Sequence, residues 1–194
     1  MALNILLLGP QGAGKGTQGK LISAEYSIPH IATGDILRTA MAQGTELGAR
    51  VKPIYDSGGL VPDDIMIELI RERLTADDAA DGFVLDGFPR TAVQAEALDE
   101  MLEEIGRSLS VVLEFQLNVE VAIERLTRRA GQEGRADDTP EAIRRRLALY
   151  HELTEPLIEH YRARGNLIGI RADRPIEGVF EEIRRVLEQV AVRG

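Results

Sequence analysis

Residues 3–17, Leu-Asn-Ile-Leu-Leu-Leu-Gly-Pro-Gln-Gly-Ala-Gly-Lys-Gly-Thr, join an apolar run to a glycine-rich loop and the start of a helical pattern. The apolar run predicts a buried strand. The glycines of the loop allow backbone dihedrals that other residues avoid, so that successive N–H groups can converge on an anion. A helix that begins near Lys15 adds free N–H groups and the positive end of its dipole. This order predicts a site for a nucleoside triphosphate or a similar polyphosphate, with glycines at Gly9, Gly12, Gly14 and Gly16.

Two side chains of the loop extend this prediction. Lys15 can reach the outer phosphates, and the hydroxyl of Thr17 can join the shell of a bound magnesium ion. The general pattern has Ser or Thr directly after the lysine, whereas Gly16 intervenes here. Because the chain contains 20 Arg and only 3 Lys, a lysine in the loop indicates a need for a compact ammonium group. An ordinary glycine-rich turn is the weaker alternative.

Length and composition restrict the class of protein. A chain of 194 residues, 44% hydrophobic and 28% charged, is typical of one globular domain with a sizeable core. The lack of cysteine excludes disulfides and thiolate zinc sites. The first apolar run is too short to span a bilayer and has no basic leader, so we expect a cytoplasmic protein without a signal peptide. The net charge of −9 argues against a nucleic-acid partner.

Short apolar runs alternate with helical patterns along the whole chain. This alternation predicts an α/β fold, in which a parallel sheet is covered by helices on both faces. Ligands of such sheets bind at the carboxyl ends of the strands, so the segments 33–35 and 86–90 are expected to line the same cleft as the phosphate loop. We expect strands at 3–8, 28–32, 82–86, 110–116 and 166–170, and helices at about 15–25, 34–43, 46–56, 63–75, 91–105, 119–130, 140–163 and 176–191.

Two segments read as insertions into this pattern. Residues 33–61 hold two short helices between the second and third strands. Residues 129–138, Arg-Ala-Gly-Gln-Glu-Gly-Arg-Ala-Asp-Asp, form a polar loop between two helices. Thr139-Pro140 then predicts an N-cap followed by proline at the first helical position. Polar loops with glycines and arginines are candidates for lids that close over a substrate.

Helical periodicity separates the arginines on either side of the polar loop. In 119–130 an apolar face is formed by Val119, Ala122, Ile123, Leu126 and Ala130. At about 100° per residue, Arg128 points away from that face, whereas Arg125 and Arg129 lie along its edge. We expect arginines at the edge of a core face to reach the cleft.

The same reasoning applies to the segment after the loop. Ile143, Leu147 and Tyr150 define its core side, so Arg145 points to solvent and Arg146 lies at the core edge. We therefore favour Arg125, Arg129 and Arg146 as site residues. Arg135, on the loop, cannot be placed by periodicity.

Asp86 and Arg90 follow the strand at 82–86. Asp86 would end a buried strand beside the phosphate loop, where a carboxylate can hold the waters around magnesium; a capping role at Gly87 is the alternative. Arg90, after Pro89, is held in an extended approach and can fork onto a phosphate. We expect no nucleophilic His: His30, His151 and His160 are assigned to the surface or the core.

Five stretches of the chain together resemble the adenylate kinase family, and the similarity spans nearly the whole chain. The resemblance implies a P-loop fold of three layers with a five-stranded parallel sheet in a single domain, 1–194. It also implies a small helical AMP-binding insertion at 32–61 and a short lid at 128–138, without a zinc site. The stretches are Gly-Pro-Gln-Gly-Ala-Gly-Lys-Gly-Thr (9–17), Thr-Gly-Asp-Ile-Leu-Arg (33–38), Gly-Leu-Val-Pro-Asp (59–63), Leu-Asp-Gly-Phe-Pro-Arg-Thr (85–91) with Gln94, and Gly-Arg-Ala-Asp-Asp (134–138).

The resemblance implies the reaction ATP + AMP ⇌ 2 ADP with magnesium, catalysed by a monomer, with no nucleic-acid or membrane partner. Magnesium would have no direct protein ligand, with Thr17 and Asp86 acting through water. The implied ATP site comprises Gly12, Ala13, Gly14, Lys15, Gly16, Thr17, Arg125, Arg129 and Arg174, the last through its backbone near the adenine. The implied AMP site comprises Thr33, Arg38, Gly59, Leu60, Val61, Gly87, Arg90, Gln94, Arg135 and Arg146. The implied catalytic residues are Lys15, Arg90, Arg129, Arg135 and Arg146.

Two other functions remain as alternatives. A UMP/CMP kinase would share the phosphate loop and the Asp-Gly-Phe-Pro-Arg segment. Thr33, where the pyrimidine family has Ala, and Gln94, whose amide can match adenine, both favour AMP. A nucleotide-binding regulator would not need arginines on two separate segments, and the guanine motif Asn-Lys-x-Asp of switch GTPases is absent from the sequence.

Overall fold

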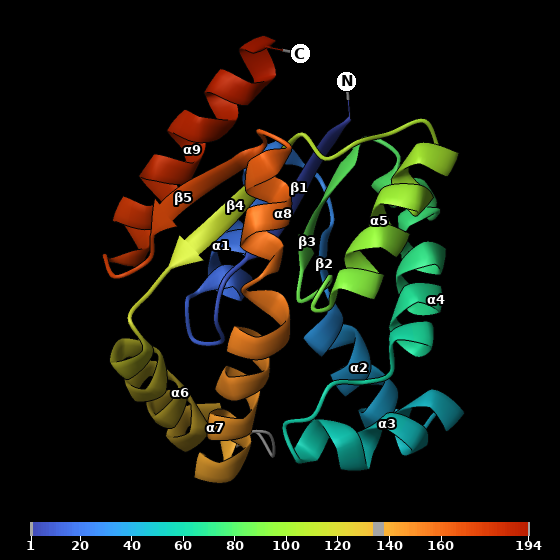
Figure 1. Ribbon diagram of the computed structural model, residues 1–194, viewed down its shortest axis with the longest axis vertical. Helices are drawn as coiled ribbons and strands as arrows, with labels where there is room; N and C mark the ends of the chain where they lie inside the picture. Colours follow the sequence, from blue (N-terminus) through green and yellow to red (C-terminus); the bar gives the residue numbers. More distant parts are fainter. Residues whose placement is uncertain (1, 134–137, 194) are drawn as a thin grey trace.

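The computed structural model describes residues 2–133 and 138–193. In this part of the chain, five strands form one parallel sheet in the order β2-β3-β1-β4-β5 (Figure 1). The predicted fold class and sheet are therefore confirmed. The strands are β1 (Leu3–Leu8), β2 (His30–Ala32), β3 (Gly82–Asp86), β4 (Val111–Gln116) and β5 (Leu167–Arg171).

The alternating side chains of β1 divide the apolar core between the two faces of the sheet. Leu6 and Leu8 pack into one half of the core, and Ile5 and Leu7 into the other. Helices cover both faces and complete three layers (Figure 1). The first half packs against α4 (Asp63–Leu74), α5 (Ala92–Glu104) and α8 (Leu157–Ala163), and the second against α1 (Lys15–Tyr26) and α9 (Ile176–Arg193).

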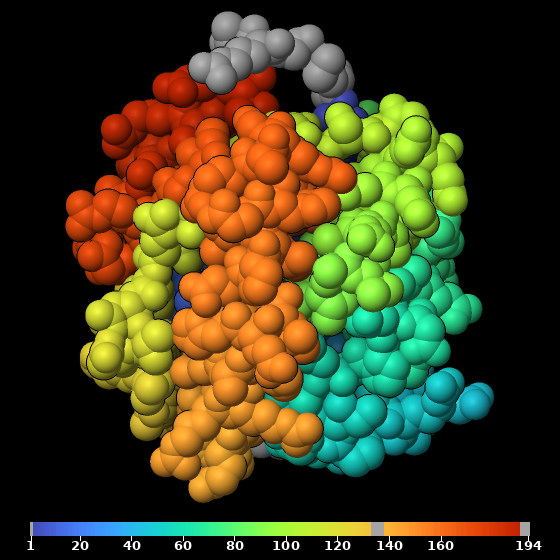
Figure 2. Space-filling view, in the orientation of Figure 1, coloured from blue at the N-terminus to red at the C-terminus, as the bar shows by residue number. Residues whose placement is uncertain are grey.

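Two pairs of helices lie beyond the carboxyl ends of the strands. The first pair, α2 (Thr33–Ala42) and α3 (Glu46–Asp56), follows β2. The second pair, α6 (Val119–Glu133) and α7 (Pro140–Leu149), follows β4 and lies on the other side in Figure 1. In the space-filling view, the chain from α7 to α8 crosses the face between α6 and the helices α3 to α5 (Figure 2).

The prediction of one continuous helix over 140–163 is wrong. The Thr139 cap is confirmed, because its hydroxyl accepts the Ala142 N–H at 3.2 Å. The helix α7 ends at Leu149, and a π-helical turn follows at Tyr150–Thr154, in which the Glu155 N–H bonds to the Tyr150 carbonyl at 2.8 Å. Pro156 explains the break, since proline has no N–H to donate and its ring clashes with the preceding turn. A 3-10 turn at Asp77–Ala79 precedes β3.

Within the described residues, no helix has both the length and the apolar character needed to cross a lipid bilayer.

Candidate active site

The phosphate loop connects β1 to α1 through backbone conformations that require glycine. Gly9 has a φ of +140°, and a Cβ there would lie 2.7 Å from the Phe115 carbonyl oxygen. Gly14, with a φ of 88°, is the N-cap of α1. Gly14 has no side chain that could cap α1, and the first turn of the helix has no acidic residue. The first N–H groups of the helix are therefore available to an anion at this end.

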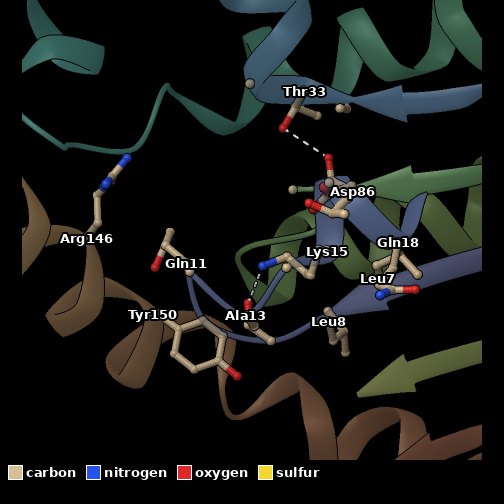
Figure 3. Close-up of a pocket in the computed structure, with 18 of the residues that line it drawn as sticks. Leu7, Leu8, Gln11, Ala13, Lys15, Gln18, Thr33, Asp86, Arg146 and Tyr150 are labelled. Atoms are coloured by element: carbon tan, nitrogen blue, oxygen red, sulfur yellow. Dashed lines mark hydrogen bonds between the residues drawn. The ribbon is translucent and has the colours of Figure 1, made fainter. Parts of the chain in front are cut away.

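Lys15 lies at the centre of the loop. Its ammonium donates to the carbonyl oxygens of Gly9 at 2.7 Å and Pro10 at 3.0 Å. Burial lowers the pKa of Lys15 to about 8; the charge of Asp86 opposes this shift and that of Arg90 adds to it. Figure 3 shows Lys15 and Asp86 together in the hollow beneath Thr33. Such a poorly solvated cation is suited to binding a phosphate group.

Asp86 ends β3 beside the phosphate loop, as expected. Its Oδ2 lies 3.6 Å from Nε2 of His30, whose side chain is only 8% exposed. Burial opposes ionisation of Asp86, but the neighbouring His30, Lys15 and Arg90 outweigh it and hold the pKa of the carboxyl below its ordinary value. Asp86 is therefore a carboxylate at neutral pH.

The donor set around Asp86 fits a magnesium ion held mainly by substrate. Within the described residues, no three His, Asp or Glu side chains cluster to bind a metal by themselves. Asp86 and the exposed hydroxyl of Thr17 both line the cleft. Magnesium commonly keeps several waters and binds through one carboxylate and substrate phosphates, which needs no more protein oxygens than these.

A single cleft of about 890 Å³ brings together nearly all of the predicted site residues. Arg135 is the exception, because it lies outside the described residues. The cleft extends from the phosphate loop to α2 on one side, and to α6, α7 and the start of α9 on the other. Predicted residues that line it are Gly12, Ala13, Gly14, Lys15, Gly16, Thr17, Thr33, Arg38, Gly59, Leu60, Val61, Asp86, Gly87, Arg90, Gln94, Arg125, Arg129, Arg146 and Arg174.

Buried polar groups organise the end of the cleft near β2 and β3. Thr33 is 1% exposed, and its hydroxyl donates to the Asp86 carbonyl at 3.4 Å. A Cβ on Gly87 would lie 2.4 Å from that hydroxyl, so only glycine fits there. The Arg90 Nε donates to the Gly87 carbonyl at 2.8 Å, which turns the guanidinium back toward the cleft.

Gln94 is held in one orientation. Its Oε1 accepts the Arg90 N–H at 2.8 Å, and its Nε2 donates to Asp63 Oδ1 at 2.7 Å. Gln94 is 2% exposed and lines the cleft. Each end of the amide retains one further hydrogen-bonding position, so it can still pair with a base.

Arginines from α6 and α7 converge on one buried carboxylate. Arg129 forks onto Asp138, with Nε to Oδ2 at 2.6 Å and Nη2 to Oδ1 at 2.7 Å. Arg146 donates to the same Oδ1 at 2.6 Å. Burial opposes ionisation of Asp138, but both arginines outweigh it and hold its pKa below the ordinary value. Figure 3 shows Tyr150 on the side of the phosphate loop opposite Thr33, and Arg146 at the left beyond Gln11.

Periodicity correctly places Arg125, Arg129 and Arg146 at the cleft. It is wrong for Arg128, which lines the cleft as well, and for part of the apolar face. Arg146 is 8% exposed, while the side chain of Arg128 is 65% exposed and pairs with Glu124. Val119 and Ile123, predicted to be in the core, are 36% and 41% exposed. Ala122 and Leu126, from the same face, lie against Gly12 of the phosphate loop. Val119 and Ile123 are exposed because α6 lies at the edge of the molecule with little chain to cover it (Figure 1).

Two further arginines contact other parts of the site. Arg125 Nη1 lies 3.5 Å from the Gly12 carbonyl. Arg174 bonds to the Arg171 carbonyl and to Glu182, so its side chain is engaged at the start of α9.

Arg145 is exposed, as expected, yet donates to Ser57 Oγ at 3.1 Å and so joins α7 to the chain after α3.

Several residues that contact the site residues escaped the sequence analysis, among them Asp138, Asp63 and Tyr55. Asp138 binds Arg129 and Arg146, Asp63 binds Gln94, and Tyr55 binds Arg38. Asp63 and Asp138 belong to stretches quoted above, but nothing in their spacing indicates their partners. Tyr55 carries no sequence signal beyond its place near the end of an expected helix.

Comparisons with known proteins identify the relatives of this chain. A family model described as "Adenylate kinase" matches residues 7–166. Adenylate kinase of Nitrobacter hamburgensis is 46% identical over 193 residues, covering 96% of this chain and 93% of the relative. Adenylate kinase of Thermobifida fusca is 47% identical over 189 residues, covering 97% and 100%. Adenylate kinase of Archaeoglobus fulgidus is 42% identical over 215 aligned residues, covering 97% and 99%.

Proposed function

This chain belongs to the adenylate kinase family, a family of nucleoside monophosphate kinases. We propose the following mechanism by which its cleft transfers a phosphoryl group from ATP to AMP. The reaction brings two polyanions into line, and their mutual repulsion is the main obstacle. The chain supplies permanently charged guanidinium groups from several elements, which fork onto phosphate oxygens. Positioning and charge stabilisation therefore supply most of the rate.

The donor, ATP, binds at the phosphate loop in this proposal. The N–H groups of residues 12–17 and the ammonium of Lys15 hold the phosphates of ATP. When ATP binds, the Lys15 ammonium exchanges its hydrogen bonds to the loop carbonyls for hydrogen bonds to phosphate oxygens. Arg125 and Arg129 close over the nucleotide from α6. The backbone near Arg174 contacts the adenine, a role supported by the position of Arg174 on the cleft wall.

The acceptor, AMP, binds between α2 and β3. Arg38 and Arg90 hold its phosphate, while Thr33, Gly87 and Gln94 lie around the nucleoside. The backbone of Gly59, Leu60 and Val61 contacts the adenine. The hydrogen bonds that fix the Gln94 amide support this assignment, because they leave a donor and an acceptor in a fixed place for the base.

The transferring phosphoryl group lies between these two sites. We propose that Lys15, Arg90, Arg129, Arg135 and Arg146 surround it and spread its charge. The observation that carries this proposal is the pairing of Arg129 and Arg146 on Asp138 beside the phosphate loop. In the proposal, residues 32–61 form an AMP-binding insertion and residues 128–138 a short lid, which excludes water from the donor.

A magnesium ion bound with ATP would offset part of the charge of the phosphates. Asp86, ionised and beside Lys15, and the Thr17 hydroxyl would hold its water shell. We expect Asp86→Asn to raise the magnesium concentration needed for half-maximal rate, with a smaller effect on AMP affinity. Zinc has no role in this proposal.

The substrate assignment is tested by measuring phosphoryl transfer from Mg-ATP to AMP, CMP, UMP and GMP in parallel, together with ATP hydrolysis without acceptor. We expect rapid ADP formation with AMP and negligible hydrolysis. A preference for CMP or UMP would mean that Thr33 and Gln94 have been misinterpreted, and the chain would then act as a UMP/CMP kinase.

From the family resemblance alone, we also propose that the protein acts as a monomer in the cytoplasm. Light scattering in solution would check the first point, with the mass of a single chain as the expected result. Fractionation of the source cells would check the second.

A further inference from the structure

The guanidinium of Arg38 is held by two helices of the proposed AMP-binding insertion. Its Nη2 donates to Asp35 Oδ1 within α2, and its Nη1 donates to the hydroxyl of Tyr55 in the last turn of α3. The side chain folds back over Gly34, where a Cβ would lie 3.1 Å from Nη1. The charge of Arg38 is thereby placed at the N-terminus of α2, where an anion is favoured.

Tyr55 has a second connection, through its backbone. Its carbonyl accepts the Gly58 N–H at 2.9 Å, and the carbonyl of the preceding Ile54 accepts the Gly59 N–H at 2.9 Å. These bonds anchor the turn that leads into Gly59–Val61, the segment proposed to contact adenine. Tyr55 lines the cleft, and its ring packs against the apolar core. Tyr55 therefore contacts the phosphate-binding arginine and, through Gly58, the turn that leads into the base-binding backbone.

We propose that the Tyr55 hydroxyl is a positioning group for the acceptor, holding Arg38 at the distance from Gly59–Val61 that a nucleoside monophosphate spans. This inference rests on the proposed role of Arg38 in binding the AMP phosphate. Two of the five guanidinium N–H groups bind Asp35 and Tyr55, which leaves others for phosphate oxygens. An arginine already held in place loses less rotamer freedom when the phosphate binds, so AMP affinity increases.

The test is Tyr55→Phe, which keeps the ring and both backbone bonds but removes the hydroxyl. The KM for AMP is expected to rise about fivefold to tenfold, the size of one ordinary lost hydrogen bond. The kcat, the KM for ATP and the thermal midpoint stay near those of the wild type. The matched control is Tyr26→Phe, at the end of α1 and outside the cleft, which leaves all four quantities unchanged.

A second pair of variants separates this inference from the assignment of Arg38. Arg38→Ala should raise the KM for AMP, and adding Tyr55→Phe to it should have little further effect, because the hydroxyl acts through the arginine. If Arg38→Ala raises that KM but Tyr55→Phe alone does not, the positioning role is wrong and the proposed function stands. Equal increases in the KM for AMP and for ATP in Tyr55→Phe also contradict the positioning role. If Arg38→Ala leaves the KM for AMP unchanged, the proposed acceptor site itself is wrong.

Discussion

At the scale of single residues, the environment of Lys15 connects burial directly to function. The ammonium is half-buried and bonded to two carbonyl oxygens of its own loop, while Arg90, Arg129 and Arg146 repel its charge. These neighbours would be unfavourable in a purely structural role. They become favourable once a polyanion arrives, because each cation then faces phosphate oxygens.

Replacing Lys15 with Met tests this interpretation. We expect kcat to fall about 10³- to 10⁵-fold, as when one phosphoryl-clamping cation is lost. The thermal midpoint should not fall, because a poorly solvated charge is removed. The control is Lys52→Met, whose exposed ammonium pairs with Asp56 on α3. Turnover near that of the wild type in Lys15→Met would remove this residue from the mechanism.

The low pKa of Lys15 predicts proton uptake on nucleotide binding. With a pKa of about 8, roughly half of the free enzyme carries a neutral lysine at pH 8. Bound phosphates favour the charged form and raise this pKa, so ATP binding at pH 8 takes up protons, and ATP affinity falls as the pH rises through 8. Calorimetry in two buffers of different ionisation enthalpy measures the uptake. Lys15→Met should lose this contribution, and an unchanged uptake would assign it to another group.

At the scale of elements, α5 shows how the helices are fixed to the sheet. Leu98, on its inner side, is fully buried in the half of the core that packs against α4. Val93, in its first turn, is 55% exposed. Thr91 caps the helix through the Gln94 N–H at 3.2 Å, so the start of α5 also determines where the Gln94 amide lies.

This contrast within one helix predicts different effects on stability. Leu98→Ala should lower the free energy of unfolding by about 2–5 kcal/mol, since it leaves a cavity in a closed part of the core. Val93→Ala should change it by less than about 0.5 kcal/mol. Urea denaturation followed by circular dichroism compares the two. A similar loss in both variants would mean that α5 is packed differently.

At the scale of the whole molecule, Asp138 joins segments that are separate in the sequence. Its side chain is fully buried and receives Arg129 from α6 and Arg146 from α7. The two helices also share the small apolar cluster of Leu126, Ile143 and Leu147. We infer that this carboxylate determines how the arginines of the proposed lid approach the phosphate loop.

Replacing Asp138 with Ala should affect stability and activity together. Arg129 and Arg146 would lose the buried carboxylate that they share, and breaking a buried ion pair costs about 3–5 kcal/mol. We also expect kcat to fall by at least about tenfold, because a small displacement of positioned groups is enough for that. Glu124→Ala on the exposed side of α6, which removes only the pairing with Arg128, is the control. A stable Asp138→Ala enzyme with normal kcat would contradict the inference.

Local sequence patterns are sufficient to predict the α/β class, the strand–loop–helix order at residues 3–17 and the edge positions of Arg125, Arg129 and Arg146. These follow from periodicity and local chemistry, since apolar spacing gives the direction of a side chain about its own helix. Glycines that adopt a positive φ can likewise be predicted from the local sequence.

The contacts that those side chains make depend on how the elements pack against one another, and these contacts are seen in the tertiary structure alone. The pairing of Asp138 with two helices, of Tyr55 with Arg38 and of His30 with Asp86 joins residues on different elements. The exposure of Val119 and Ile123, and the break before α8, depend in the same way on what lies opposite each segment. Periodicity describes one element around its own axis, whereas a contact depends on the relative placement of two elements.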